Sequence, residues 1–245
     1  PSNNVSDARS IAVARGFKQF TVAHSFTITT EDLSVGYKFI GDSPFVVITA
    51  DASADMTNCS MESLTLQGEL DGLNVVRSCA IQQVSNISGI FEKCAFSEFT
   101  NTLSGRLELY ECYSKVEGDA FPTFDIGASA MICRDYKGSI GIANAQAGTV
   151  CSLGIESGFF NILSSCVGGS LHLRGEPIGI NDSSQVGCDV IDQTSSYKVN
   201  EIYKANFNRR YHDKVANTIT IYEADNVTPF KVFNADDDLI EIVPV

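Results

Sequence analysis

The sequence contains no tryptophan, only 6 prolines and no long hydrophobic run. The longest apolar stretches, such as residues 44–48, are about five residues, whereas a membrane-spanning helix needs roughly 20. This excludes a helical membrane protein. Glycine, at 19 of 245 residues, is far too sparse for a collagen-like chain. No charged leader followed by an apolar core opens the sequence, so we expect no secretory signal.

Basic residues are also scarce, because 17 Lys and Arg face 30 Asp and Glu, giving a net charge of −13. A nucleic-acid-binding protein usually presents a basic face, and this chain has none of any size. The charge is unevenly distributed. Residues 198–214 are mostly basic among their charged positions, and residues 223–241 are strongly acidic. The sequence therefore predicts an acidic body and a chemically different C-terminal segment.

The 8 cysteines recur about every 18 residues, at positions 59, 79, 94, 112, 133, 151, 166 and 188. No two of them have Cys-x-x-Cys spacing, and none pairs with histidine at a zinc-ligand interval. The regular interval indicates a structural repeat. Three flanks share one pattern of a polar residue, cysteine, a small residue and an apolar residue: Asn58-Cys59-Ser60-Met61, Ser78-Cys79-Ala80-Ile81 and Lys93-Cys94-Ala95-Phe96.

Between the cysteines, apolar residues alternate in short bursts such as Leu64-Thr65-Leu66 and Leu107-Glu108-Leu109. Sixteen of the 19 glycines lie between residues 68 and 187. Strands this short, with turns this frequent, are not typical of a barrel or sandwich. Helical periodicity is absent from this region.

We therefore predict an all-β fold built on a parallel β-helix over residues 41–193. Its coils would lie about 4.8 Å apart, so that like side chains form ladders. An ordinary antiparallel sandwich with coincidentally spaced cysteines is the alternative. Because free cysteine is among the most buried residue types, we expect reduced core thiols.

Residues 1–40 are expected to cap the first coil as β-structure, with 20–23 and 26–29 as a hairpin pair, because an uncapped β-helix exposes its edges. Residues 194–245 are predicted to form a helix and then a hairpin of 218–222 with 230–233. The helix carries an apolar, largely aromatic stripe. Either it covers the last coil as a lid or it is a subunit interface, with these candidate interface residues: Val199, Ile202, Tyr203, Phe207, Arg209, Arg210, Tyr211 and Val215.

No strong catalytic set is present, and we expect no cofactor and no metal site. The three histidines lie in different regions, and Asp236-Asp237-Asp238 lacks an ordered ligand pattern. A glycosidase needs two facing carboxylates, for which the candidates are Glu108, Glu111, Glu117, Asp119, Asp125 and Asp135. Exposed aromatic residues would serve as sugar-stacking platforms, and the best candidates are Tyr110, Tyr113 and Tyr136.

Residues 37–187 resemble a family of phage virion proteins with a right-handed β-helix. The resemblance rests on repeat style and on these segments: Gly41-Asp42-Ser43-Pro44, residues 58–72, Glu111-Cys112-Tyr113-Ser114, residues 121–127 and Leu173-Arg174-Gly175. Three C-terminal segments are similar to the tail regions of such proteins: Asn208-Arg209-Arg210, Thr220-Ile221-Tyr222 and Val227-Thr228-Pro229. The resemblance implies a tail fibre, tail spike or baseplate component, and related spikes are commonly trimers.

We therefore expect a non-enzymatic structural virion protein, made in the host cytoplasm, with residues 194–245 as its attachment or oligomer surface. Its expected partners are further copies of itself, favouring a homotrimer, other virion proteins and a host surface glycan, but neither nucleic acid nor a membrane. The alternatives are a polysaccharide depolymerase, a capsid decoration or head-spike protein, and a bacterial surface adhesin.

Overall fold

A computed structural model describes two separate units of this chain, Pro1–Asp192 and Gln193–Val245. Backbone and side chains are described for residues 5–29, 36–52, 54–73, 75–114 and 120–195. In the second unit only the backbone of four strands is described beyond residue 195. The division between the units falls one residue before the expected boundary at residues 193 and 194.

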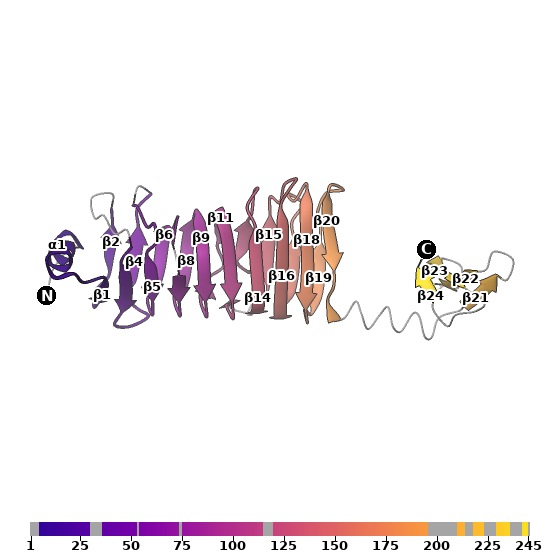
Figure 1. The fold of residues 1–245 in the computed structure, drawn as a ribbon, viewed down its shortest axis with the longest axis horizontal. Coiled ribbons are helices and arrows are strands. Elements are labelled where there is room, and N and C mark those ends of the chain that lie inside the picture. Colours follow the sequence, from indigo (N-terminus) through magenta and orange to yellow (C-terminus); the bar gives the residue numbers. More distant parts are fainter. Residues whose placement is uncertain are drawn as a thin grey trace. The chain divides into compact units, whose positions relative to one another are not determined.

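The first unit is a parallel β-solenoid, in which each strand pairs with the corresponding strand of the next coil (Figure 1). In the described residues, ten strands form the first ladder: β1 (Gln19–Val22), β3 (Lys38–Gly41), β5 (Ser60–Glu62), β7 (Val75–Arg77), β9 (Ile87–Glu92), β11 (Thr100–Tyr110), β14 (Met131–Lys137), β16 (Val150–Ser157), β18 (Gly169–Gly175) and β20 (Cys188–Asp192).

Two shorter ladders complete the coils. The second ladder contains β2 (Phe26–Ile28), β4 (Val47–Ala50), β6 (Thr65–Glu69), β8 (Ala80–Ser85), β10 (Ala95–Phe96) and β12 (Tyr113–Ser114). The third runs from the start of β11 through β13 (Thr123–Asp125), β15 (Ile140–Ala143), β17 (Phe159–Ile162) and β19 (Gly179–Asp182). Because all these pairings are parallel, the antiparallel sandwich alternative is wrong.

The core is built from stacked columns of apolar side chains, because alternate residues of each strand point into the solenoid. One column of the first ladder runs through Phe39, Met61, Val76, Phe91, Leu109, Cys133, Leu153 and Leu173, all at most 2% exposed. Successive members of this column are 15 to 24 residues apart. The coil length therefore varies, and the 18-residue cysteine interval is only an average of it.

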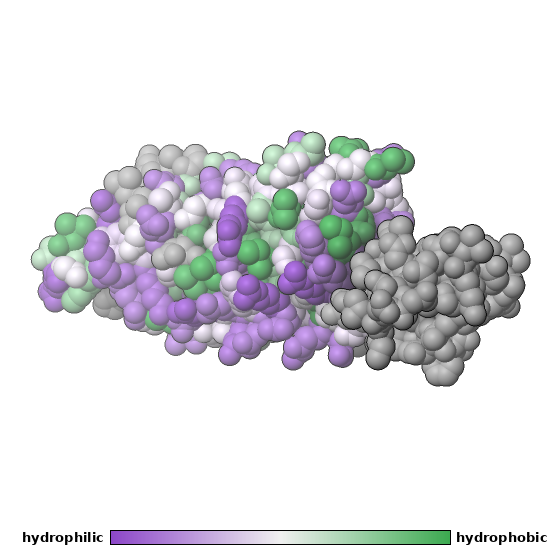
Figure 2. All heavy atoms as spheres, turned by 45° about the vertical axis from the view of Figure 1, so that its right-hand side comes forward, coloured by the Kyte–Doolittle hydropathy of each residue, from purple (hydrophilic) through white to green (hydrophobic). Residues whose placement is uncertain are grey.

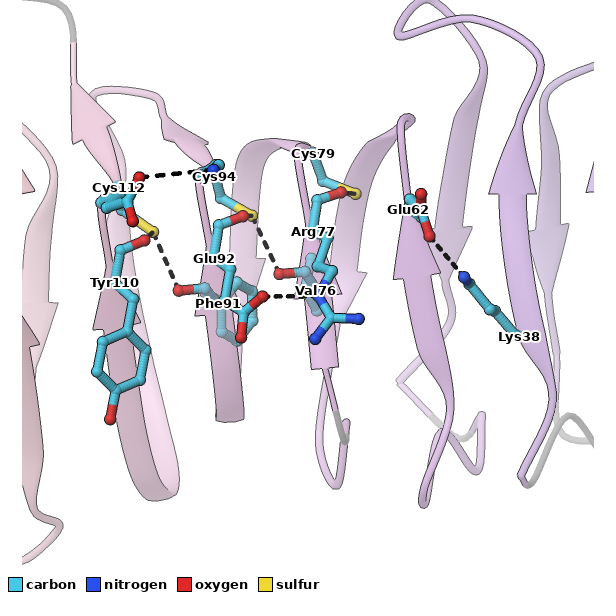
Figure 3. A network of polar contacts seen from close by, with 12 residues as sticks. Lys38, Glu62, Val76, Arg77, Cys79, Phe91, Glu92, Cys94, Tyr110 and Cys112 are labelled. Atoms are coloured by element: carbon cyan, nitrogen blue, oxygen red, sulfur yellow. Dashed lines mark hydrogen bonds and ion pairs between the residues drawn. The ribbon is translucent and has the colours of Figure 1, made fainter.

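All 8 cysteines are buried and unbridged, but they do not form one stack. Cys79, Cys94 and Cys112 follow the same corner in three successive coils (Figure 3). Cys133 instead belongs to the column that contains Leu109. The Cys94 thiol donates to the Val76 carbonyl at 3.5 Å and the Cys112 thiol to that of Phe91 at 3.2 Å. Cysteine therefore serves as a small buried residue at more than one position of the coil.

The N-terminal segment differs from the expected hairpin. β1 pairs in parallel with β3, and β2 pairs in parallel with β4, so both strands already belong to the solenoid. The solenoid therefore begins at Gln19 rather than at residue 41. Before it lies the helix α1 (Val5–Arg15), which the sequence analysis does not predict. Ala12 of this helix, 1% exposed, belongs to the hydrophobic core.

In the second unit, four described strands form an antiparallel sheet: β21 (Arg210–Asp213), β22 (Thr218–Tyr222), β23 (Pro229–Ala235) and β24 (Ile242–Pro244). β22 and β23 occupy the segments for which we predict a hairpin. Arg210 and Tyr211 lie in a strand, so the prediction that the helix extends through them is wrong. Strand pairing with the β-branched residues of β22 outweighs their helical spacing. The other candidate interface residues lie outside the described residues: Val199, Ile202, Tyr203, Phe207, Arg209 and Val215.

Within the part of the chain that the structure describes, no helix combines the length and the apolar character required to cross a membrane.

Candidate functional site: an open groove beside a column of charged residues

Each coil turns sharply between the first and second ladders, and this corner organises the outer surface. The corner residue has a left-handed backbone in five successive coils, with φ of 51° to 56° at Ser63, Ser78, Lys93, Glu111 and Asp135. This conformation costs a non-glycine residue about 1 kcal/mol or more. The corners stack through backbone hydrogen bonds, such as Ser78 N–H to the Glu92 carbonyl at 2.9 Å. The following residue then points inward.

The residues immediately before these five corners point outward, and together with Gly154 and Arg174, which continue the same register, they form what we call the outer column. Its members in chain order are Glu62, Arg77, Glu92, Tyr110, Arg134, Gly154 and Arg174. Adjacent coils are joined by ion pairs, including Lys38 to Glu62 at 2.6 Å and Arg77 to Glu92 at 2.6 Å (Figure 3). These exposed pairs are individually weak, but each opposes a shift of one coil against the next.

The middle of the outer column is a hydrogen-bonded group around Tyr110. The Tyr110 hydroxyl donates to Glu108, and the Arg106 guanidinium donates to the same carboxylate at 2.8 Å. The hydrogen bond from Tyr110, and then the hydrogen bond and the positive charge of Arg106, hold the pKa of Glu108 below its usual range. On the next coil, the Arg134 guanidinium lies 5.8 Å from the centre of the Tyr110 ring, which is a cation–π distance. Arg134 is therefore positioned by Tyr110.

The outer column is interrupted at Gly154, which has no side chain to place between Arg134 and Arg174. The pairing of β14 with β16 is irregular at this point. Cys133 pairs with Leu153 and Tyr136 with Ile155, so that Arg134 and Asp135 together face the single residue Gly154. Such a β-bulge bends the strand and changes the direction of its side chains. The bulge and the missing side chain together open a groove.

This groove has a volume of about 670 Å³ and is open to solvent. Its lining contains two arginines, Arg134 and Arg174, and three acidic residues, Asp135, Glu156 and Glu176. Figure 2 shows the mixture of hydrophilic and hydrophobic residues on one face of the first unit, with hydrophilic ones gathered along one side.

The charges of the groove are partly balanced within the protein. Lys137, at the end of β14, forms an ion pair with Glu156 at 3.3 Å. Ser152 contributes a hydroxyl on the strand that carries Gly154. An arginine donates up to five hydrogen bonds in a planar fork that matches a carboxylate, whereas carboxylates accept hydrogen bonds from hydroxyl groups. The groove can therefore bind a ligand that has both an anionic group and several hydroxyls.

The groove contains part of the predicted set of carboxylates and leaves the rest elsewhere. Asp135 lines it, but Glu108 is held by Tyr110 and Arg106 as described above. Glu111 forms an ion pair with Lys93 at 3.6 Å, and Asp125 accepts from Asn144 Nδ2 at 2.7 Å. Glu117 and Asp119 lie outside the described residues. No group of three or more His, Cys, Asp or Glu side chains in the described residues is arranged to hold a metal ion.

Of the three candidate aromatic platforms, Tyr113 is 48% exposed and Tyr110 stands in the outer column. Tyr136 is fully buried, so its expected exposure is wrong. It follows the left-handed corner at Asp135 and therefore points inward, as Cys79, Cys94 and Cys112 do after theirs.

Sequence reasoning missed Gly154, Arg174, Glu156 and Glu176 as members of one site. The only signal that would find them is the register of successive coils, which sets Gly154 beside Arg174.

The chain matches no known family model, no curated protein and no solved structure.

Proposed function

We propose that this protein is a non-enzymatic structural component of a tailed-phage virion, a tail fibre, tail spike or baseplate subunit. In this role it binds other virion subunits or a host surface. The observation that supports the proposal is the continuous parallel pairing of the first ladder, in which every strand from β1 to β20 pairs with the corresponding strand of the next coil. A solenoid in which every coil is hydrogen-bonded to its neighbours resists bending, which a projecting virion part requires.

The exposed surface of the solenoid suits such a role. Five ion pairs occur in the described residues, and four of them join residues at least 15 positions apart in the sequence. These four pairs join successive coils and leave a charged surface. The net charge of −13 opposes non-specific association at the high local copy number of a virion.

The proposal includes a right-handed solenoid, since parallel crossovers are right-handed in nearly all proteins. It also includes a homotrimer, with the second unit as the attachment or oligomer surface and the residues named above as its candidate interface. The groove beside Gly154 is the part of the first unit that contacts a host surface.

Gold-labelled antibodies against the solenoid, applied to particles of the phage that encodes this chain, test the location by electron microscopy. Label on the tail or baseplate supports the proposal. Label confined to the head favours a decoration or head-spike protein, and unlabelled particles with label on bacterial cells favour an adhesin. Light scattering of the purified chain tests the trimer, for which a 26.4 kDa species alone at micromolar concentration would be the contradicting result.

A glycan-cleaving enzyme is the second candidate, because Asp135 and Glu176 line the same groove and a glycosidase uses a pair of carboxylates. Incubation with capsular polysaccharide or lipopolysaccharide separates the two functions. New reducing ends that are lost in both Asp135→Asn and Glu176→Gln would establish the enzyme and overturn the non-enzymatic proposal.

A further inference from the structure

We propose that Cys94 and Cys112 are a redox-active pair, which hydrogen peroxide oxidises to a disulfide that links two adjacent coils. This inference goes beyond the proposed function and does not depend on it. Three observations support it: the stack of thiols at one corner of the solenoid, the backbone contacts on both sides of the pair, and the unequal environments of the two sulfur atoms.

The thiols are stacked at the corner that follows the first ladder. Strand pairing places Cys79, Cys94 and Cys112 in register there, in three successive coils (Figure 3). All three are at most 2% exposed. The same position is occupied by Leu64 in the preceding coil and by Tyr136 in the following one. The stack therefore contains three thiols, and Cys94 and Cys112 form its last adjacent pair.

Backbone hydrogen bonds hold Cys94 and Cys112 at a separation that suits a disulfide. The Lys93 N–H donates to the Tyr110 carbonyl at 2.9 Å on one side of the pair, and the Tyr113 N–H donates to the Cys94 carbonyl at 2.9 Å on the other. Facing residues of adjacent parallel strands lie about 4.8 Å apart, and a disulfide accepts Cα separations of about 4.4 to 6.8 Å. Rotation of the two side chains therefore brings the sulfur atoms together without a slip of the coils.

The environments of the two sulfur atoms differ in a way that assigns a role to each. Hydrogen bonding from the Cys94 thiol lowers the pKa of Cys112, and the same contact, together with burial, raises the pKa of Cys94. The thiolate is the reactive form of cysteine. Cys112 is therefore the thiol that reacts first, and Cys94 is the thiol that resolves the intermediate. Burial raises the pKa of the third thiol, Cys79, which makes it the less reactive neighbour.

The oxidation consumes one hydrogen peroxide for each pair of thiols. The Cys112 thiolate attacks one peroxide oxygen and displaces hydroxide, which leaves a sulfenic acid on Cys112. The Cys94 sulfur then attacks the sulfenic sulfur, and a second hydroxide leaves. The two hydroxides take up the protons that the two thiols have lost. Two thiols and one peroxide thus give one disulfide and two water molecules, with both sulfur atoms oxidised and both peroxide oxygens reduced.

The bridge links two coils that are otherwise joined only by non-covalent contacts, among them the ion pair of Lys93 with Glu111 at 3.6 Å. It closes a loop of one coil, residues 94–112, and a closed loop restricts the unfolded chain. Because both thiols are buried, the oxidant reaches them during local opening of the coils. Oxidation should therefore be slow, and the oxidised solenoid should be more resistant to unfolding.

Peptide mapping of the full chain after treatment with hydrogen peroxide and alkylation tests the pair. Trypsin places each stacked cysteine in a separate peptide, because it cleaves after Arg77, Lys93, Arg106 and Lys115. We expect a cross-linked product of residues 94–106 and 107–115 that separates on reduction with dithiothreitol. The oxidised chain should melt at a temperature higher by about 5 °C or more than the reduced chain.

Cys112→Ala should abolish both the cross-linked product and the rise in melting temperature. Cys151→Ala is the matched control, because Cys151 is also fully buried but pairs with Leu171 of the next coil. It should retain both effects. The mapping of the unsubstituted chain needs no variant, so the assignment of the bridge can be checked even if Cys112→Ala folds poorly.

The inference is overturned if Cys94 and Cys112 stay open to alkylation of the unfolded chain while glutathione in the same solution is oxidised. A product that joins residues 78–93 to 94–106 would assign the bridge to Cys79 and contradict the pair named here. A rise in melting temperature that persists in Cys112→Ala would likewise show that the bridge is not its cause.

Discussion

Gly154 pairs with Arg174 across β16 and β18. Because glycine has no side chain, the outer column, whose other members are charged or aromatic, has a gap at this coil. The bulge in the adjacent β14 places the two residues Arg134 and Asp135 opposite the single residue Gly154. The candidate site therefore arises from the stacking of three coils. No single strand contains it, and its geometry depends on the register of the solenoid.

Close packing between coils predicts that Gly175 cannot be replaced. Gly175 has a φ of +93°, and a Cβ there would overlap the backbone carbonyl of Ile155 on the preceding coil. Gly175→Ala should lower the free energy of unfolding by on the order of 3 kcal/mol or more, measured by urea denaturation. Gly148 is the control, because its φ is +88° but a Cβ would meet nothing within 4 Å. Gly148→Ala should cost only about 1 to 2 kcal/mol, and equal losses in the two variants would contradict the account.

The stacked interior columns predict a large cost for truncating Phe91. This residue is fully buried, and its ring centre lies 5.8 Å from that of Phe96. Phe91→Ala should lower the free energy of unfolding by about 3 to 5 kcal/mol. Phe45→Ala removes the same side chain at a site that is 88% exposed, and should change stability by less than about 0.5 kcal/mol. A small effect at Phe91 would mean that its column is not part of the core.

Buried thiols predict a loss of stability at alkaline pH. Burial raises the pKa of Cys79 to about 11 and that of Cys151 to about 11. Their thiols stay protonated in the folded protein, whereas in the unfolded chain they ionise near their ordinary pKa of about 8.5. Stability is therefore complete below that pH and falls as the pH rises toward 11, by about 2 to 3 kcal/mol for each of these thiols.

Denaturation curves of the protein and of Cys79→Ala between pH 8 and pH 11 check this expectation. The variant is less stable at pH 8 because it leaves a cavity, but its disadvantage should shrink as the pH rises. If the two stability profiles stay parallel over this range, the thiol of Cys79 is not protected by burial.

The hydrogen bonds to Glu108 predict a contribution to the stability of the folded protein that is lost at acid pH. Because Tyr110 and Arg106 stabilise the carboxylate, the pKa of Glu108 is lower in the folded protein than in the unfolded chain. The contribution is present above the usual pKa of about 4.3 and is lost as the pH falls through the lowered value. Glu108→Gln should therefore reduce stability at pH 7, by about 1 kcal/mol, and flatten the decline below pH 4.5. Glu98→Gln, at an exposed position, is the control and should change stability at pH 7 by less than about 0.5 kcal/mol.

Much of the solenoid could be predicted from the sequence, because its signals are local. The pattern of cysteine, small residue and apolar residue at Cys79 and Cys94 marks a corner followed by a strand of the second ladder. The corners themselves could not be predicted. Left-handed backbone is typical of glycine and asparagine, yet Lys93 and Glu111 adopt it here. Stacking of the coils compensates for the local strain of these residues.

The candidate site was less predictable than the fold. A carboxylate such as Asp135 could be named as one of six candidates, but its neighbours in the groove come from coils about 20 and 40 residues later. Gly154 carries no chemical group and acquires its role only through its position beside Arg174. The register also explains why Tyr136 is buried. Tyr136 follows the left-handed corner at Asp135, and nothing in the sequence around Asp135 indicates such a corner.

We propose that the stack of parallel coils projects from a virion and presents this groove. If a phage encodes the chain, as this proposal requires, the most direct test is electron cryomicroscopy of its particles at a resolution that separates strands about 4.8 Å apart. The account predicts tail or baseplate density that resolves into parallel coils and fits residues 19–192. Particles that lack the chain, or density at its position with two opposed antiparallel sheets, would contradict it.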